Sequence, residues 1–165
     1  MGALTGLKIL DFSTLLPGPY ASLVLADLGA EVVHISSKTR YDLVAHWPPY
    51  IEEAGVTAAA AWLGRNKKTV TLDLKRPAAI EAVKKMLTEY DIVLEQMRPG
   101  VMDRLGLGYE ELRAINPRLI YCSLTGYGTT GPLKDRAGPD INYLSRAGVM
   151  DAAGRKAEGP SLYNM

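Results

Sequence analysis

Short apolar runs alternate with helical patterns along most of this chain. Residues 7–11, 31–35, 91–94 and 118–124 are apolar runs, and the alternating, β-branched segment 68–74 completes a set of five predicted strands. Segments 20–28, 77–89 and 109–115 have the punctuation and spacing of helices. Regular alternation of strands and helices is typical of an α/β domain. We therefore expect a mainly parallel sheet with flanking helices.

Proline and glycine mark several of the boundaries. Pro19 suits the first turn of a helix because its missing N–H would have no intrahelical partner, and Gly29 is suited to end that helix. Residues 36–64 are less regular, with a loop at 47–50 and a short helix at 56–63. Further predictions are a helix over 139–150 and a strand-like piece at 161–165.

Composition narrows the class of protein. The chain has 165 residues, a net charge of +1 and one cysteine, Cys122. A net charge of +1 does not indicate a basic surface for nucleic acid. A single cysteine excludes a disulfide framework within the chain, so we expect a cytoplasmic location. We find no 18-residue apolar span and no signal segment, and the two histidines are not clustered for a metal site.

Glycines and cations follow the predicted strands. Gly126-Tyr127-Gly128-Thr129-Thr130-Gly131-Pro132 comes directly after the run at 118–124, and Arg98-Pro99-Gly100 follows the run at 91–94. Glycines let a ligand approach the backbone closely, and guanidinium groups grip phosphates. Since loops after parallel strands meet at one sheet edge, these features favour an anionic, nucleotide-like ligand there. The alternative is that these charges are ordinary solvated strand ends.

The first strand–helix turn does not carry a dinucleotide fingerprint. Segment 12–19 contains one glycine, so the close approach of a pyrophosphate is not encoded in the usual way. The second strand ends in Ser36-Ser37-Lys38-Thr39-Arg40, which offers hydroxyls and cations instead of a carboxylate for a ribose. NAD binding is therefore disfavoured. Ser13 lacks a nucleophile-elbow context, and we interpret His34 as structural and Asp140 as a residue that caps or begins a helix.

Seven segments, taken in order and at similar spacing, resemble CoA-transferase family III, the CaiB/BaiF family. The segments are 4–12, 17–19, 27–35, 66–68, 72–75, 98–107 and 126–132. That family also includes α-methylacyl-CoA racemases and the carnitine CoA-transferase. The resemblance covers nearly the whole chain, and the combination is specific although no single motif is.

The resemblance implies a Rossmann-like large domain, residues 1–165, that binds CoA or acyl-CoA. It also implies a dimer of interlocked chains, with a CoA thioester and a carboxylic acid as substrates. Lys38 would meet the phosphorylated ribose, and Leu72 and Lys75 would line the adenine and its phosphates. The remaining implied CoA-binding residues are Gln96, Met97, Arg98 and Arg104, which would flank the adenosine diphosphate, and Arg136 in a later loop.

Two departures from the family pattern bear on catalysis. The transferase nucleophile is an Asp in a Gly-Asp segment that should follow the strand beginning near Leu162, and the chain stops at Met165. We therefore expect a truncated chain without a catalytic residue of its own. Racemases have a proton-abstracting His before an Asp-Ile-Asn-Tyr segment, where this chain has Pro139. Proline cannot transfer a proton, so transferase ancestry is favoured over an epimerase. A non-catalytic CoA-binding module that needs a second chain is the third hypothesis.

Overall fold

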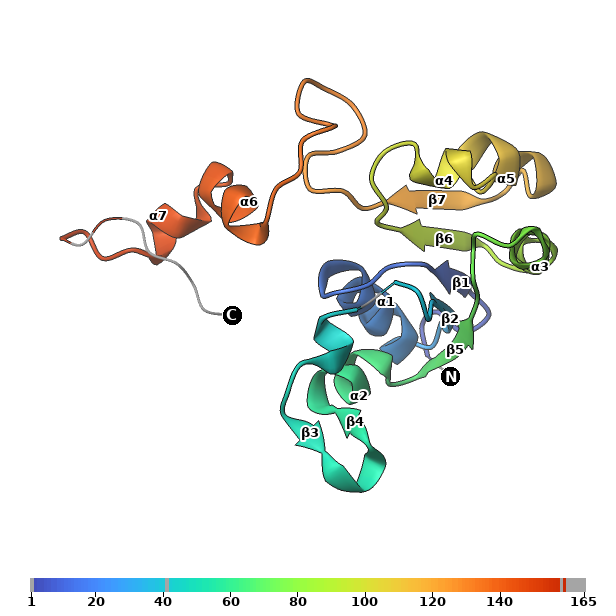
Figure 1. Ribbon diagram of the computed structural model, residues 1–165, viewed down its shortest axis with the longest axis horizontal. Helices are drawn as coiled ribbons and strands as arrows, with labels where there is room; N and C mark the ends of the chain where they lie inside the picture. Colours follow the sequence, from blue (N-terminus) through green and yellow to red (C-terminus); the bar gives the residue numbers. More distant parts are fainter. Residues whose placement is uncertain (1, 41, 158, 160–165) are drawn as a thin grey trace. The chain divides into compact units, whose positions relative to one another are not determined.

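The computed structural model describes residues 2–40, 42–157 and 159. The chain folds as two compact units, residues 1–124 and 125–165. The first unit holds the predicted α/β arrangement (Figure 1). Its strands are β1 (Lys8–Asp11), β2 (Glu31–Ser36), β3 (Tyr50–Ile51), β4 (Val56–Thr57), β5 (Lys67–Thr71), β6 (Ile92–Glu95) and β7 (Ile120–Ser123). Its helices are α1 (Pro17–Asp27), α2 (Ala58–Gly64), α3 (Pro77–Leu87), α4 (Val101–Arg104) and α5 (Tyr109–Ile115), with short 3₁₀ turns at Val44–His46 and Glu52–Ala54.

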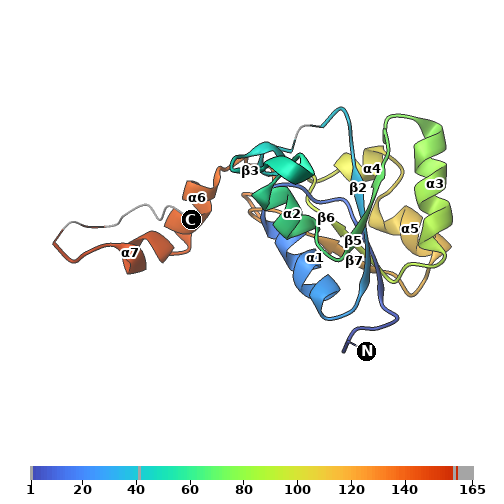
Figure 2. The same cartoon turned by 90° about the horizontal axis from the view of Figure 1, so that it is seen from below.

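Five strands form one parallel sheet in the order β5-β2-β1-β6-β7. All five were expected from the sequence, and the mainly parallel α/β architecture is confirmed. In the first unit, α1 and α2 lie on one side of the sheet and α3 and α5 on the other (Figure 2). A separate antiparallel pair, β3 and β4, lies in the region where only a loop and a short helix were expected.

Alternation along the strands builds a core on each face of the sheet. In β1, Ile9 packs with Ala26, Ala30 and Val32 on the α1 side. Its neighbour Leu10 packs on the other side in the larger cluster, which includes residues of α3, α5 and the turn after α4. Successive strand residues point to opposite faces, so both are fully buried. The sheet is thereby fixed between two helical layers.

The second unit contains α6 (Asp140–Arg146) and α7 (Val149–Ala153). The single helix expected over 139–150 is wrong, because Gly148 adopts a left-handed φ of 76° and caps α7. Asp140 is the first residue of α6, as one of its two interpretations held. The strand-like piece at 161–165 lies outside the described residues.

Candidate functional site

The strand order reverses between β1 and β6. From β1 the chain proceeds outward to β2 and β5, and then returns to β6 and β7 on the other side. In open α/β sheets, ligands bind beyond the carboxyl ends of the strands at such a switch point. The segments that follow Asp11 and Glu95 flank this point. The topology therefore favours a binding site at the carboxyl edge of the sheet.

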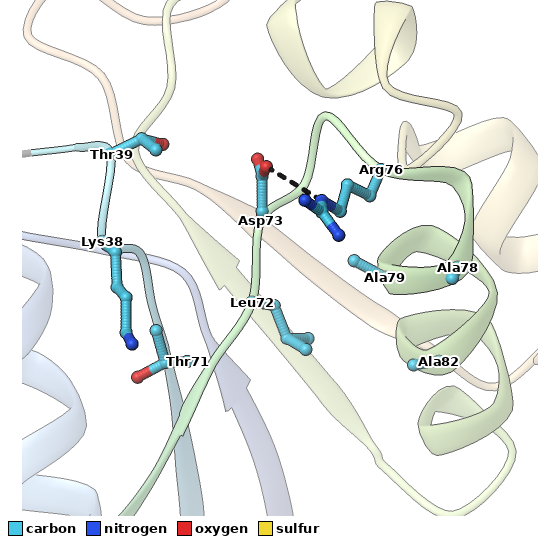
Figure 3. A pocket seen from close by; sticks show the side chains of 9 residues that line it. All are labelled: Lys38, Thr39, Thr71, Leu72, Asp73, Arg76, Ala78, Ala79 and Ala82. Atoms are coloured by element: carbon cyan, nitrogen blue, oxygen red, sulfur yellow. Dashed lines mark ion pairs between the residues drawn. The ribbon is translucent and has the colours of Figure 1, made fainter.

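A cavity of about 550 Å³ opens along this edge beside β5. Figure 3 shows Lys38 and Thr71 on one side of it, and Arg76 with alanines of α3 on the other. The carboxylate of Asp73 lies 3.7 Å from Nε of Arg76. The full lining of this larger cavity is Lys38, Thr39, Thr71, Leu72, Asp73, Arg76, Ala78, Ala79 and Ala82. The small alanine side chains leave space for a ligand, and Lys38 and Arg76 place cationic side chains in the wall of the cavity.

A second cavity, of about 240 Å³, continues toward the switch point. It shares Thr39, Leu72 and Asp73 with the first, so the two adjoin. Apolar side chains make most of its wall, and Arg40 and Lys75 are its two cations. The full lining is Phe12, Ile35, Ser36, Ser37, Thr39, Arg40, Leu72, Asp73, Leu74, Lys75, Met97, Val101 and Leu105. Apolar walls with a few polar groups are typical of sites for small molecules.

Four of the eight candidate residues line these cavities. Lys38 lines the larger, Lys75 and Met97 line the smaller, and Leu72 lines both. Because the strand expected over 68–74 ends at Thr71, Leu72 belongs to the loop that forms the shared wall. The structure thus brings the candidates after β2, β5 and β6 to one edge of the sheet.

The other four candidates line neither cavity. Gln96 donates from Nε2 to the hydroxyl of Thr14 at 3.1 Å, which joins the loops after β6 and β1. Arg98 is exposed, and Arg104 ends α4. Arg136 belongs to the second unit. The binding roles of all eight residues stay predictions.

A buried carboxylate, that of Asp11, holds the turn between β1 and α1 in place. Asp11 is fully buried and accepts hydrogen bonds from the backbone N–H of Ser13 and from the hydroxyls of Ser13 and Ser22. Nζ of Lys67 lies 3.8 Å from the same carboxylate and donates to the Pro19 carbonyl at 2.7 Å. Burial lowers the pKa of Lys67, against the opposing effect of Asp11. Sequence reasoning missed this cluster, because its members come from four separate segments.

A second buried carboxylate lies at the end of β6. Glu95 accepts a hydrogen bond from the backbone N–H of Met97 at 2.6 Å and another from the Ser123 hydroxyl. It is only 4 % exposed. Since one carboxylate ties the β6 turn to β7, it fixes the start of the loop that carries Met97. In the sequence, Glu95 appears only as the end of an apolar run, and no pattern there indicates that its carboxylate joins two loops.

The glycine-rich loop lies in the second unit. A methyl group at Gly126 would collide with the ring of Tyr143, so the close approach that this glycine allows is made by the chain's own side chain. The rings of Tyr127 and Tyr143 pack edge to face with centroids 4.9 Å apart. Gly128 and Gly131 adopt positive φ and have open space around their Cα atoms. Gly126 therefore has an internal packing role in this structure, and ligand approach at this loop stays a prediction.

Two kinds of feature, a metal site and a membrane-spanning helix, are absent from residues 2–40, 42–157 and 159. Within these ranges, no three His, Cys, Asp or Glu side chains come together as a metal site would require. No helix in the described part of the chain is both long and apolar enough to span a bilayer.

Comparison with known proteins identifies the family. The family model described as CoA-transferase family III matches residues 4–165. The chain is 39 % identical to an acyl-CoA transferase of Fusarium pseudograminearum over 168 residues, covering 98 % of this chain and 37 % of that protein. It is 40 % identical to the human α-methylacyl-CoA racemase, covering 96 % and 37 %. It is also 37 % identical to the mouse succinyl-CoA:glutarate CoA-transferase, covering 97 % and 36 %.

Solved structures agree with the sequence relatives. A CAIB/BAIF family protein from Brucella suis superposes with a TM-score of 0.91 at 36 % identity, over 99 % of this chain and 44 % of that one. The chain spans a little over a third of the length of the curated relatives named above. The matched residues include all seven segments that carried the resemblance. The chain belongs to CoA-transferase family III.

Proposed function

We propose that this chain binds CoA or acyl-CoA at the carboxyl edge of its sheet, as the N-terminal portion of an acyl-CoA:carboxylate CoA-transferase. The observation that carries the proposal is the pair of adjoining cavities, lined by Lys38, Lys75 and Met97 and bridged by Leu72. Cations beside apolar walls suit a ligand with both phosphates and an adenine ring. Membership of the family supplies the CoA thioester as the ligand class.

The residues of this chain would bind and orient the ligand rather than react with it. In a CoA-transferase the acyl group passes through a covalent intermediate on a carboxylate. None of the eight residues to which we assign CoA binding is a carboxylate. The carboxylate of Asp73, which lines both cavities, lies 3.7 Å from Nε of Arg76, and we assign it no reaction with the acyl group. We therefore propose that the chain alone binds CoA without turnover. An assay that detects acyl transfer by the purified chain would contradict this.

The epimerase alternative rests on the similarity to α-methylacyl-CoA racemases. Pro139 precedes Asp140 where a racemase carries a proton-transferring His. Exchange of deuterium into the α-carbon of an acyl-CoA would favour this alternative. A non-catalytic module that requires a second polypeptide is the remaining alternative. Acyl transfer restored by adding a complementary chain would favour a split enzyme over a module that takes no part in catalysis.

We also propose that the protein works as an oligomer, with a homodimer or a complementary chain as the partner. Large apolar side chains of the first unit are exposed on neighbouring helices: Tyr20 of α1 is 49 % exposed and Trp62 of α2 is 46 % exposed, and their ring centroids lie 5.7 Å apart. Exposed apolar groups on neighbouring elements favour association. Sedimentation equilibrium of the purified chain tests this, and a monomer at micromolar concentration would contradict self-association.

The deciding experiment is a calorimetric titration with CoA and with dephospho-CoA. We expect CoA to bind more tightly, because Lys38 would meet the 3′-phosphate. Lys38→Ala should remove most of the difference between the two ligands. Lys85→Ala is the matched control, since Lys85 is a lysine of α3 outside both linings. If the wild-type chain binds neither ligand, the proposed function fails for this chain.

A further inference from the structure

Arg40 joins the two loops that flank the switch point. Its Nη2 donates to the carbonyl of Phe12 at 2.9 Å, directly after β1. Its Nη1 donates to Sδ of Met97 at 2.9 Å, just beyond β6. The side chain is half-buried and lines the smaller cavity beside Lys75. One guanidinium therefore reaches both sides of the point where the strand order reverses.

The charge of Arg40 has no carboxylate in contact. Both of its hydrogen-bond acceptors are neutral, and a thioether sulfur is a weak acceptor. Among the described residues, no carboxylate oxygen lies within 4.0 Å of this guanidinium. Burial lowers its pKa, although an arginine stays protonated at neutral pH. A half-buried cation without a paired anion is unfavourable until an anion arrives.

The nearest acidic groups are already engaged elsewhere. Asp42 accepts from the backbone N–H groups of Leu15, Val44 and Ala45. Asp11 accepts from the hydroxyls of Ser13 and Ser22. Both carboxylates raise the pKa of Arg40 through space, but burial outweighs them. Neither needs the guanidinium as a hydrogen-bond donor, so Arg40 retains donors for an incoming ligand.

We propose that Arg40 binds a phosphate oxygen of a nucleoside diphosphate group at the switch point. This inference rests on the proposed function and deepens it, since CoA carries such a group. A phosphate oxygen is a much stronger acceptor than the Met97 sulfur, so the ligand would replace that contact. The bond to the Phe12 carbonyl holds the guanidinium in position meanwhile. Lys75, in the same cavity, supplies a second positive charge.

The test compares Arg40→Met with the wild-type chain in calorimetric titrations of CoA, ADP, pyrophosphate and adenosine. We expect the variant to lose about tenfold or more in affinity for CoA, ADP and pyrophosphate, since a charge-assisted bond is lost. Affinity for adenosine should change less than twofold. Arg113→Met is the matched control, because Arg113 is an exposed arginine of α5 outside both cavities. It should leave all four affinities unchanged.

Several outcomes separate this inference from the proposed function. Unchanged ADP affinity in Arg40→Met overturns the role of Arg40 while CoA binding by the wild type stands. An equal loss for ADP and adenosine also overturns it, because the residue would then only shape the cavity. Binding of pyrophosphate but not CoA by the wild type, lost in the variant, supports the phosphate site and contradicts the proposed function. Binding of none of the three anions by the wild type overturns both.

A second variant covers the case in which Met at position 40 unfolds the chain. Arg40→Lys keeps the charge but cannot reach both acceptors as a fork. We expect it to retain part of the ADP affinity, with a steeper loss as salt is added than in the wild type. ADP affinity equal to that of the wild type across the salt series would overturn the specific role of the guanidinium.

Discussion

Lys67 and Asp11 form a buried ion pair beneath the first strand–helix turn, with Nζ and Oδ2 3.8 Å apart. The Lys67 side chain is 3 % exposed and that of Asp11 is fully buried. Lys67 belongs to the edge strand β5, whereas Asp11 ends the central strand β1. The pair therefore links the edge of the sheet to its centre, immediately below the segment that precedes α1.

Removing one member of this pair should be costly. Lys67→Met would leave the buried Asp11 carboxylate with hydroxyl and amide donors and with the His34 ring, whose Nδ1 lies 3.9 Å from Oδ2, but without the lysine cation. The expected loss is about 3–5 kcal/mol in the free energy of unfolding. Asp11→Asn combined with Lys67→Met should recover part of that loss, because neither charge remains unpaired. Urea denaturation followed by circular dichroism measures both.

An exposed pair provides the control. Glu110 and Arg113 are neighbours on α5, and their side chains are 77 % and 54 % exposed. Glu110→Gln should leave the free energy of unfolding almost unchanged, because solvent screens such pairs. A loss from Lys67→Met no larger than that from Glu110→Gln would refute the structural role of the buried pair.

Gly18 is required where α1 passes close to the turn after β1. A methyl group there would collide with the side chain of Ser13 and lie 3.0 Å from Oε1 of Gln96. We expect Gly18→Ala to cost about 1–3 kcal/mol by overpacking. Because Gln96 must also shift, CoA affinity should fall in the same variant. Thermal unfolding and titration with CoA report the two effects.

Gly64 is the matched glycine. It lies in α2 with no atom within 4 Å of the position of a new methyl group. Gly64→Ala should be neutral or slightly stabilising, since alanine favours the helix. If the two substitutions lower the melting temperature equally, the close contact of Gly18 with Ser13 is not the reason that position 18 needs a glycine.

The stability of the chain should depend on pH through His34. Burial lowers the pKa of this histidine, and the opposing attraction of Asp11 does not cancel the effect. The unfolded chain therefore binds a proton more readily than the folded one, so stability is lost as pH falls below about 6.5. Urea denaturation at pH 7.5 and pH 5.5 should show a smaller difference for His34→Gln than for the wild type. Equal differences in the two proteins would mean that other groups cause the dependence.

The sheet could be predicted because its strands are short apolar runs separated by strong helix signals. Ile9 and Val93 are fully buried, as their runs indicated. The break at Gly148 could not be predicted in this way, because a glycine inside a helical pattern is either tolerated or adopts a left-handed φ. The hairpin of β3 and β4 was missed since each strand has only two residues.

The candidate site could be predicted in part, because the predicted strands also fix where the loops that follow them lie. Lys38, Leu72 and Lys75 follow strand ends, and parallel strands bring their carboxyl ends to one edge. The contacts of Arg40 with Phe12 and Met97 span 28 and 57 positions of sequence. Such contacts depend on side-chain packing, which no local pattern encodes. Asp11 and Glu95 were missed because a carboxylate at the end of an apolar run resembles an ordinary strand end.

The larger cavity owes its volume to small residues of α3. Ala78 lines it and is exposed, so a larger side chain there fits without disturbing the core. We expect Ala78→Leu to lower CoA affinity about tenfold while leaving the melting temperature nearly unchanged, because leucine would fill space that the ligand needs. Glu81→Leu, at an exposed position of the same helix outside the lining, should leave CoA affinity as it is. Titration of both variants with CoA decides the matter, and equal affinities in the two would place the ligand elsewhere on the sheet edge.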